Sequence, residues 1–121
     1  VVICDGEVLG KPVDEADAIR MLKMLSGKTH HVVTGVTLGR GCRYSSFSVD
    51  TAVTFRELSD QEIKAYGKSG EPMDKAGAYG IQGLGALLVE KIDGDFYNVV
   101  GLPVSRLAEE LHEFLKKVQS K

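Results

Sequence analysis

Two Asp-Gly dipeptides, Asp5-Gly6 and Asp93-Gly94, constrain the fold of this 121-residue chain more than any other feature of its sequence. Asp-Gly suits the positive φ angles of a tight turn, and each dipeptide lies between short apolar segments. Each therefore predicts a hairpin of two antiparallel strands. The four predicted strands are Val1 to Cys4, Glu7 to Leu9, Ala86 to Ile92 and Asp95 to Val100.

Between and after these hairpins, the spacing of apolar residues predicts further strands and helices. Near-strict alternation and many Val and Thr residues predict strands from His31 to Leu38 and from Phe47 to Phe55, with a loop from Gly39 to Ser46 between them. Helices are predicted from about Glu15 to Leu25, from the capping box at Ser59 through Tyr66, and from about Ser105 to Val118. Because helices and strands interleave while hairpins force antiparallel pairs, we expect an α/β fold with a mixed sheet and flanking helices.

The composition is that of one ordinary globular domain, residues 1–121. Apolar residues make up 43% and charged residues 26%, and the apolar runs are far shorter than a membrane span. A formal charge of -2 provides no general attraction to nucleic acid or anionic lipid, so we expect neither as a partner. Cys4 and Cys42 lie far apart, and reduced thiols in a cytoplasmic protein are expected. Val1 to Cys4 has the pattern of a buried strand without an initiator Met, so we expect the natural N-terminus to lie upstream.

Several short motifs resemble known sites but lack the spacing that those sites need. Gly27-Lys28-Thr29 and Gly67-Lys68-Ser69 look like the end of a phosphate-binding P-loop, yet neither has the required glycine five residues earlier. His30 and His31 are adjacent in a predicted strand and point to opposite faces, so they do not bind one metal from the same face. No serine or cysteine has the surroundings of a hydrolase nucleophile. The sequence therefore predicts no P-loop, zinc site or covalent hydrolase.

Charged residues in two places are candidate site residues. Lys11 ends the first hairpin in Gly-Lys-Pro, where a fixed backbone can aim its ammonium at a phosphate; an ordinary surface lysine is the alternative. The long glycine-rich loop from Gly67 to Gly85 contains Glu71, Asp74 and Lys75. These charges can hold a divalent cation and a phosphate oxygen together, or they can form a solvated ion pair.

The same loop contains a candidate for base recognition, Gln82, within Tyr79-Gly80-Ile81-Gln82-Gly83. A side-chain amide can donate and accept hydrogen bonds together, as the edge of a nucleobase requires. The flanking glycines allow the backbone to approach a ligand closely or to turn tightly. A buried amide that caps the loop is the alternative interpretation of Gln82.

In chain order these clusters belong to a longer pattern that covers nearly the whole chain. It consists of Leu9-Gly10-Lys11-Pro12, Met24-Leu25-Ser26-Gly27-Lys28-Thr29-His30, Thr34-Gly35-Val36, Thr51-Ala52-Val53-Thr54-Phe55-Arg56, Leu58-Ser59, the block from Gly70 to Gly83, and Asn98-Val99-Val100-Gly101-Leu102-Pro103. This pattern resembles the Maf family of nucleotide pyrophosphatases. The block from Gly70 to Gly83 is the most specific part, whereas Gly-Lys-Pro alone would prove nothing.

The resemblance implies a fold similar to that of inosine triphosphate pyrophosphatases, a homodimer, and dependence on a divalent metal, Mg or Mn. It implies hydrolysis of a nucleoside triphosphate such as dTTP, UTP or a modified nucleotide to the monophosphate and pyrophosphate, in a housecleaning role linked to septum formation. By this resemblance Lys11 contacts phosphates, Asp74 and Lys75 shape the metal and phosphate end, and Gln82 contacts the base. Glu71 and Gly80 are expected at the substrate, and no metal ligand is assigned.

The chain departs from the family pattern at its start. Maf proteins carry a Ser-rich segment ending in Pro-Arg-Arg and an Ala-Asp-Thr just before the strand that here begins at Val1, and this sequence contains neither. That aspartate is the family's proposed general base or metal-positioning carboxylate, and the arginines clamp the triphosphate, so we expect little activity from this chain alone. Two other interpretations stay open: a catalytically inactive nucleotide sensor, and a Maf domain fused to another enzyme.

Overall fold

The computed structural model describes residues 1–119, and its centre is a five-stranded sheet with the strand order β2-β1-β3-β4-β5. The strands are β1 (Val2–Cys4), β2 (Glu7–Leu9), β3 (Thr29–Arg40), β4 (Arg43–Phe55) and β5 (Val89–Asp93). Flanking helices confirm the predicted α/β fold. Each pair of neighbouring strands in the described residues is antiparallel, so this part of the chain lacks the parallel pair that a mixed sheet would contain.

The helices cover one end and one side of this sheet. Helix α1 starts where predicted, because the Asp14 carboxylate accepts a hydrogen bond from the Asp17 backbone N–H (2.7 Å). The predicted capping box of Ser59 and Glu62 is present at the start of α2. The helices are α1 (Glu15–Leu25), α2 (Asp60–Lys68), α3 (Phe96–Val100) and α4 (Val104–Gln119), with 3-10 turns η1 (Glu71–Asp74), η2 (Ala76–Ala78) and η3 (Gly83–Leu88).

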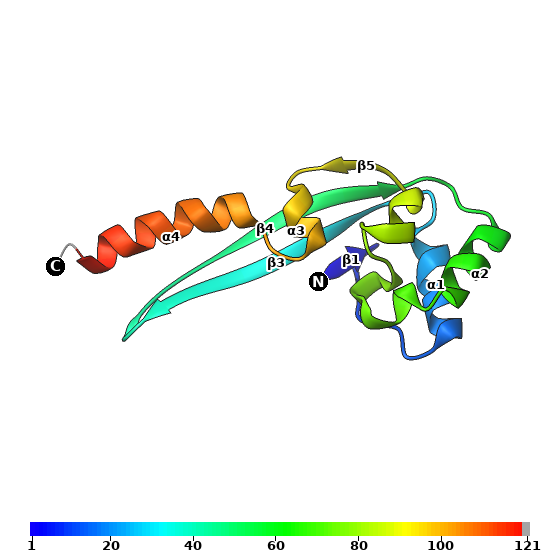
Figure 1. Cartoon of the computed structure of the whole chain (residues 1–121), viewed down its shortest axis with the longest axis horizontal. Coiled ribbons are helices and arrows are strands. Elements are labelled where there is room, and N and C mark those ends of the chain that lie inside the picture. Colours follow the sequence, from blue (N-terminus) through cyan, green and yellow to red (C-terminus); the bar gives the residue numbers. More distant parts are fainter. Residues whose placement is uncertain (120–121) are drawn as a thin grey trace.

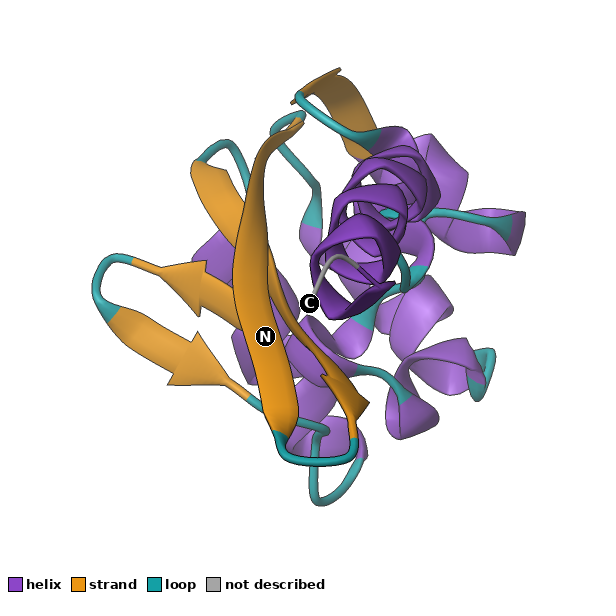
Figure 2. Ribbon diagram, turned by 90° about the vertical axis from the view of Figure 1, so that its left-hand side faces the viewer, coloured by secondary structure: helices purple, strands orange, loops and turns teal. Residues whose placement is uncertain are grey.

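The molecule is elongated, with a rounded body and a long hairpin that leaves it (Figure 1). The body contains α1, α2, β1, β2 and the 3-10 turns, while the outer half of the β3–β4 hairpin extends away from it beside α4. Figure 2 shows α4 at one side of this hairpin. Arg43 donates a hydrogen bond to the Lys117 carbonyl (2.9 Å), and the Arg106 guanidinium lies 5.2 Å from the centre of the Phe47 ring. These contacts join α4 to the hairpin at both ends of the helix.

The predicted loop from Gly39 to Ser46 is wrong, because both strands continue almost to the tip of the hairpin. Gly39 pairs with Tyr44, and Arg40 pairs with Arg43, so that only the tight turn at Gly41-Cys42 separates the strands. The Thr37 and Ser46 hydroxyls hydrogen-bond each other across the ladder (2.9 Å). This part of the hairpin lies outside the core, so its strands lack the apolar alternation from which strands are predicted.

The predicted strand from Asp95 to Val100 is also wrong, because this segment forms helix α3. The Asp95 carboxylate caps the helix by accepting hydrogen bonds from the backbone N–H groups of Tyr97 (2.9 Å) and Asn98 (3.2 Å). Strand β5 begins at Val89, later than the predicted Ala86, and pairs with β4 instead of forming a hairpin across Asp93-Gly94. A nonlocal partner therefore replaced the local one that the turn motif predicted.

The core lies between the inner half of the sheet and the apolar faces of α1 and α2. Leu22 and Leu25 of α1 are fully buried and belong to the same core cluster as Val53 and Phe55 of β4. His30 faces this core while its neighbour His31 faces solvent, as the alternation of a strand predicts. Both cysteines, buried Cys4 and exposed Cys42, are free thiols. None of the helices in residues 1–119 has the length and apolar character needed to cross a bilayer.

Candidate active site

An open cleft of about 560 Å³ lies at the junction of the sheet, the glycine-rich loop and helix α3. Strands β1 and β3 form one wall, and the chain from Lys75 to Gln82 forms another. The end of α3 closes the third side. The cleft is lined by Val1, Val2, Val32, Val33, Thr34, Gly35, Lys75, Ala76, Tyr79, Gly80, Ile81, Gln82, Asn98, Val99, Val100 and Gly101. Three of the predicted site residues, Lys75, Gly80 and Gln82, therefore share one cavity.

A cluster of three aromatic rings supports the floor of the cleft. The Tyr79 hydroxyl lies 2.6 Å from His30 Nε2, and the rings of His30, Tyr79 and Phe55 meet edge to face. Burial lowers the pKa of His30 to about 4 and raises the pKa of Tyr79 above its usual value. Both side chains are therefore neutral near pH 7, so they support the cleft without adding charge to it.

Lys75 lines the cleft, and its charged neighbours are Asp74 and Lys11. The Lys75 ammonium donates a hydrogen bond to the Asp74 carboxylate (3.0 Å), and this bond, followed by the charge of Lys75, lowers the pKa of Asp74. Lys11 adds a smaller effect in the same direction, so its charge lies near enough to act on Asp74. The loop is tied to the Gly-Lys-Pro segment because Gly77 donates its backbone N–H to the Gly10 carbonyl (3.0 Å). Lys11 itself is exposed and does not line the cleft.

Gln82 and Glu71 have different surroundings although the sequence placed both at the substrate. Gln82 lines the cleft and is an exposed residue, so a ligand can reach it. Glu71 does not line the cleft. Its carboxylate accepts hydrogen bonds from the Tyr66 hydroxyl (3.1 Å) and from the backbone N–H groups of Leu84 (3.3 Å) and Gly85 (3.1 Å). A direct contact of Glu71 with substrate stays a prediction, and the geometry gives this residue a structural role instead.

Asn98 is a cleft residue to which sequence reasoning gave no role. It is only 1% exposed, and its side-chain amide donates to the Val32 carbonyl (3.0 Å), the Val49 carbonyl (3.1 Å) and Thr51 Oγ1 (3.0 Å). These bonds fix α3 on the sheet. Its Oδ1 atom has no hydrogen-bond partner within residues 1–119. The signal in the sequence was a single amide within the otherwise apolar segment Phe96–Val100.

The donor set of the described residues does not fit a divalent cation by itself. Residues 1–119 contain no group of three or more His, Cys, Asp or Glu side chains arranged to hold a metal ion. Asp74 is the carboxylate paired with the cleft residue Lys75, and its side chain is 77% exposed. Mg²⁺ and Mn²⁺ need several oxygen ligands in close geometry, which one paired carboxylate does not supply.

The antiparallel sheet with flanking helices defines an α/β protein, and its cleft brings the ammonium of Lys75 together with the side-chain amides of Gln82 and Asn98. The sequence profile of Maf-like proteins matches residues 1–114, and the chain belongs to this family. The chain is 55% identical over 114 residues to the dTTP/UTP pyrophosphatase of Bacillus velezensis (strain DSM 23117 / BGSC 10A6 / LMG 26770 / FZB42). It is 53% identical over 114 residues to the proteins of the same name from Bacillus pumilus (strain SAFR-032) and Bacillus cereus (strain AH820).

These matches cover most of this chain but a smaller share of each relative. Each match covers 94% of this chain and 60% of the relative. The chain therefore spans about 60% of the length of the curated relatives that it matches.

Proposed function

We propose that the protein is a nucleoside triphosphate pyrophosphatase that converts a pyrimidine nucleotide, dTTP or UTP, to its monophosphate and pyrophosphate. The observation that carries this proposal is that Lys75 and Gln82, a charge for phosphate and an amide for a base, line the same cleft. Relatives named dTTP/UTP pyrophosphatase support the choice of substrate.

The base is proposed to lie against Gln82. Uracil and thymine present a ring N–H between two carbonyl oxygens, and a side-chain amide offers an acceptor and a donor that match this edge. Gly80 lies in the same wall without a side chain, so the base can approach the backbone there. Apolar side chains of Val2 and Val32 in the opposite wall can contact the face of the ring.

The phosphates are proposed to lie at the rim, near Lys75. Negative charge on the leaving pyrophosphate grows in the transition state, and a fixed ammonium stabilises it. Asp74 orients Lys75 through their ion pair (3.0 Å). Lys11, which has a small effect on the pKa of Asp74, is proposed as a second cation for the phosphates. We propose roles in catalysis for Lys11, Asp74 and Lys75 on this basis.

A divalent metal belongs to the proposal as a bound group that supplies charge neutralisation and an activated water. The described residues do not form its ligand set, so we assign no step to it in this chain. Asp74 is the carboxylate nearest the proposed phosphate position, and a ligand role for it would need the Lys75 pair to open.

Pyrophosphate release tests the enzyme proposal. The protein is incubated with UTP, dTTP and ATP, and both products are quantified; we expect equal amounts of monophosphate and pyrophosphate from the pyrimidine nucleotides. Gln82→Ala is expected to lower the ratio of kcat/KM for UTP to that for ATP about tenfold, because it removes base contacts. An unchanged ratio removes Gln82 from specificity, and absence of pyrophosphate with all three nucleotides contradicts the proposed activity.

A nucleotide sensor is the second candidate, and one observation favours it. None of the residues lining the cleft is an Asp or a Glu, so the described part of the chain offers no carboxylate there as a general base. Tight binding of UTP or dTTP without pyrophosphate release would support the sensor.

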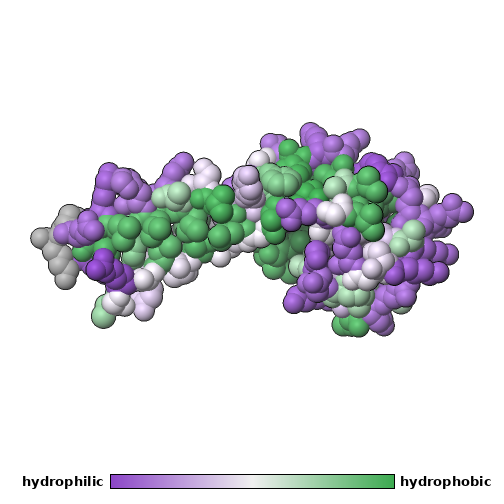
Figure 3. All heavy atoms as spheres, viewed as in Figure 1, coloured by the Kyte–Doolittle hydropathy of each residue, from purple (hydrophilic) through white to green (hydrophobic). Residues whose placement is uncertain are grey.

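We also propose a homodimer in the cytoplasm. Support for the dimer comes from large apolar side chains that are exposed on α3 and α4 and on the chain between them, and Figure 3 shows apolar surface along the extended part of the molecule. These residues are Phe96, Tyr97, Val100, Leu102, Val104, Leu111 and Leu115. The two free thiols agree with a reducing compartment.

A further inference from the structure

A hydrogen-bonded pair, Tyr66 and Glu71, lies directly behind the loop that forms one wall of the cleft. Tyr66 is 5% exposed, and its hydroxyl donates to Glu71 Oε1 (3.1 Å) while it accepts the backbone N–H of Gly80 (3.3 Å). Burial, as the largest cause, raises the pKa of Tyr66 to about 12, so the hydroxyl keeps its proton throughout the neutral range. The pair therefore fixes the position of Gly80, which lines the cleft, through the hydrogen bond to the Tyr66 hydroxyl.

Glu71 connects this pair to the far end of the loop. Its two carboxylate oxygens accept the backbone N–H groups of Leu84 (3.3 Å) and Gly85 (3.1 Å). Hydrogen bonds to a charged acceptor are stronger than those between neutral groups. One carboxylate thus fixes the backbone on the C-terminal side of Gln82, while Tyr66 fixes it on the N-terminal side.

Glycines allow the loop to wrap this closely around the pair. A Cβ atom at Gly85 would lie 1.7 Å from the Gly80 carbonyl oxygen and 3.0 Å from the Tyr66 hydroxyl. At Gly83, which has a φ of +68°, a Cβ atom would lie 3.3 Å from both Glu71 oxygens. A side chain at either glycine after Gln82 would therefore meet the pair or the Gly80 carbonyl.

The same glycine that contacts Tyr66 also contacts the cleft lysine. A Cβ atom at Gly80 would lie 2.6 Å from Lys75 Cε and 2.8 Å from Lys75 Cδ, so the stem of Lys75 runs across Gly80. A shift of Gly80 away from Tyr66 would therefore move the ammonium of Lys75 and the amide of Gln82 together. Displacements of about 1 Å in a site can change rates by orders of magnitude.

We propose that Tyr66 and Glu71 are positioning residues that set the distance between Gln82 and Lys75, and that they thereby determine how strongly the site prefers a pyrimidine nucleotide. The proposal rests on the proposed function, because it concerns the same cleft. Neither residue contacts the nucleotide: they act through Gly80 and through the backbone after Gln82. This role differs from the direct substrate contact that was expected for Glu71, which stays a prediction.

The test compares Tyr66→Phe, which removes one hydroxyl, and Glu71→Gln, which keeps the size of the side chain, with the control Ser59→Ala. Ser59→Ala removes the capping box of α2, the helix that carries Tyr66, without a change in the pair itself. We measure pyrophosphate release and, separately, the Kd values of non-hydrolysable UTP and ATP analogues, well below each variant's melting temperature. The expected result is that the preference for UTP over ATP falls about fivefold to tenfold in Tyr66→Phe and Glu71→Gln and stays unchanged in Ser59→Ala.

The two readouts separate the inference from the function on which it rests. A changed Kd ratio without pyrophosphate release from any form of the protein would support the positioning role and overturn the hydrolase. Pyrophosphate release with the wild-type preference in both pair variants would overturn the positioning role and leave the hydrolase intact. An equal loss of preference in Ser59→Ala would also overturn it, because general destabilisation would then explain the effect. If Glu71→Gln does not fold, Tyr66→Phe alone decides between these outcomes.

Discussion

Single glycines in the loop determine how closely its backbone can approach itself, and Gly85 is the tightest of them. Its missing side chain leaves room for the Gly80 carbonyl oxygen, which would lie 1.7 Å from a Cβ atom. Gly80 is less restricted, because the atoms nearest its missing Cβ belong to the flexible stem of Lys75. The two positions therefore differ in what a methyl group would displace.

We expect Gly85→Ala to lower the free energy of unfolding by more than about 3 kcal/mol, because backbone must move to admit the methyl group. Gly80→Ala should cost only about 1 kcal/mol, because Lys75 can turn away. The second variant should nevertheless lose about tenfold in kcat/KM as Lys75 leaves the rim. Urea unfolding and pyrophosphate release measure the two effects, and equal stability of both variants would contradict this assignment.

His30 makes the stability of the protein depend on pH. Burial lowers its pKa from 6.5 to about 4 in the folded state, so the unfolded chain binds more protons between these values. The stabilisation from neutral His30 is complete above pH 6.5 and is lost as the pH falls towards 4. The stabilisation that is lost over this pH range is about 3 kcal/mol.

We expect His30→Gln to lose most of this pH dependence, although it is less stable at pH 7. Urea unfolding between pH 4 and pH 7 measures it, with His112→Gln as the control because His112 is an exposed histidine on α4. The stability of the wild-type protein should change more steeply with pH than that of His30→Gln. If it does not, His30 is not the group responsible.

At the scale of elements, the local signals in the sequence were sufficient where the partners are also local. Asp5-Gly6 gave the first hairpin, and Asp14 and Ser59 gave the starts of two helices, because a turn or a cap depends on residues within one turn of chain. Asp93-Gly94 was misleading, because β5 pairs with β4, about 40 residues away in the chain. The residues around Asp93-Gly94 do not indicate a strand partner so far away in the chain.

The candidate site likewise contains residues that the sequence predicted and residues that it did not. Lys75, Gly80 and Gln82 lie in one short block, so a motif could predict them together, and the cleft contains all three. Tyr66 and Asn98 were not predicted, because their hydrogen-bond partners become neighbours only when the chain folds. The Asn98 amide reaches the carbonyls of Val32 and Val49, which only the folded sheet brings near.

Helix α4 packs against the β3–β4 hairpin, and Phe114 is the buried residue of this helix. Phe114 is 7% exposed, whereas Leu115, one position further along, is 38% exposed. We expect Phe114→Ala to lower the free energy of local opening in α4 and the outer hairpin by about 3 kcal/mol, and Leu115→Ala to lower it by less than about 1 kcal/mol. Hydrogen exchange measures both, with α1 as the internal reference. Equal exchange in the two variants would show that α4 is held by other contacts.

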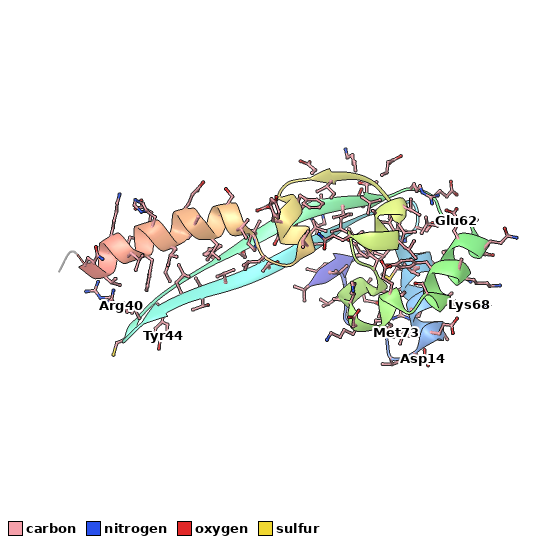
Figure 4. All side chains as sticks on the ribbon, viewed as in Figure 1. Asp14, Arg40, Tyr44, Glu62, Lys68 and Met73 are labelled. Carbon is pink, nitrogen blue, oxygen red and sulfur yellow. The ribbon has the colours of Figure 1, made fainter. Side chains whose placement is uncertain are left out.

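The molecule is elongated, and the α4 part of the proposed dimer surface lies apart from the cleft, whereas its α3 part shares Val100 with the cleft. Figure 4 shows Arg40 and Tyr44 at the tip of the hairpin and Met73 and Asp14 at the opposite end of the molecule. The exposed apolar residues of α4 extend towards the tip, whereas the cleft lies where the hairpin leaves the body. A partner bound along α4 would therefore not have to cover the part of the cleft that lies in the body.

We expect Leu111→Glu with Leu115→Glu to convert the proposed dimer to a monomer, because the carboxylates would lose their water in an apolar interface. Sedimentation velocity measures the change, and Glu109→Gln with Glu113→Gln, on the exposed polar surface of the same helix, is the control. A wild-type protein that sediments as a monomer at high concentration would contradict the proposed dimer.

The cleft between the sheet, the loop and α3 is the proposed binding site of the nucleotide. A titration of the 15N-labelled protein with a non-hydrolysable UTP analogue, followed by amide chemical shifts, tests this proposal. The predicted result is that the largest changes occur from Lys75 to Gln82 and from Asn98 to Gly101, which line the cleft from separate parts of the chain. Changes confined to other regions, such as the hairpin tip at Gly41-Cys42, would contradict it.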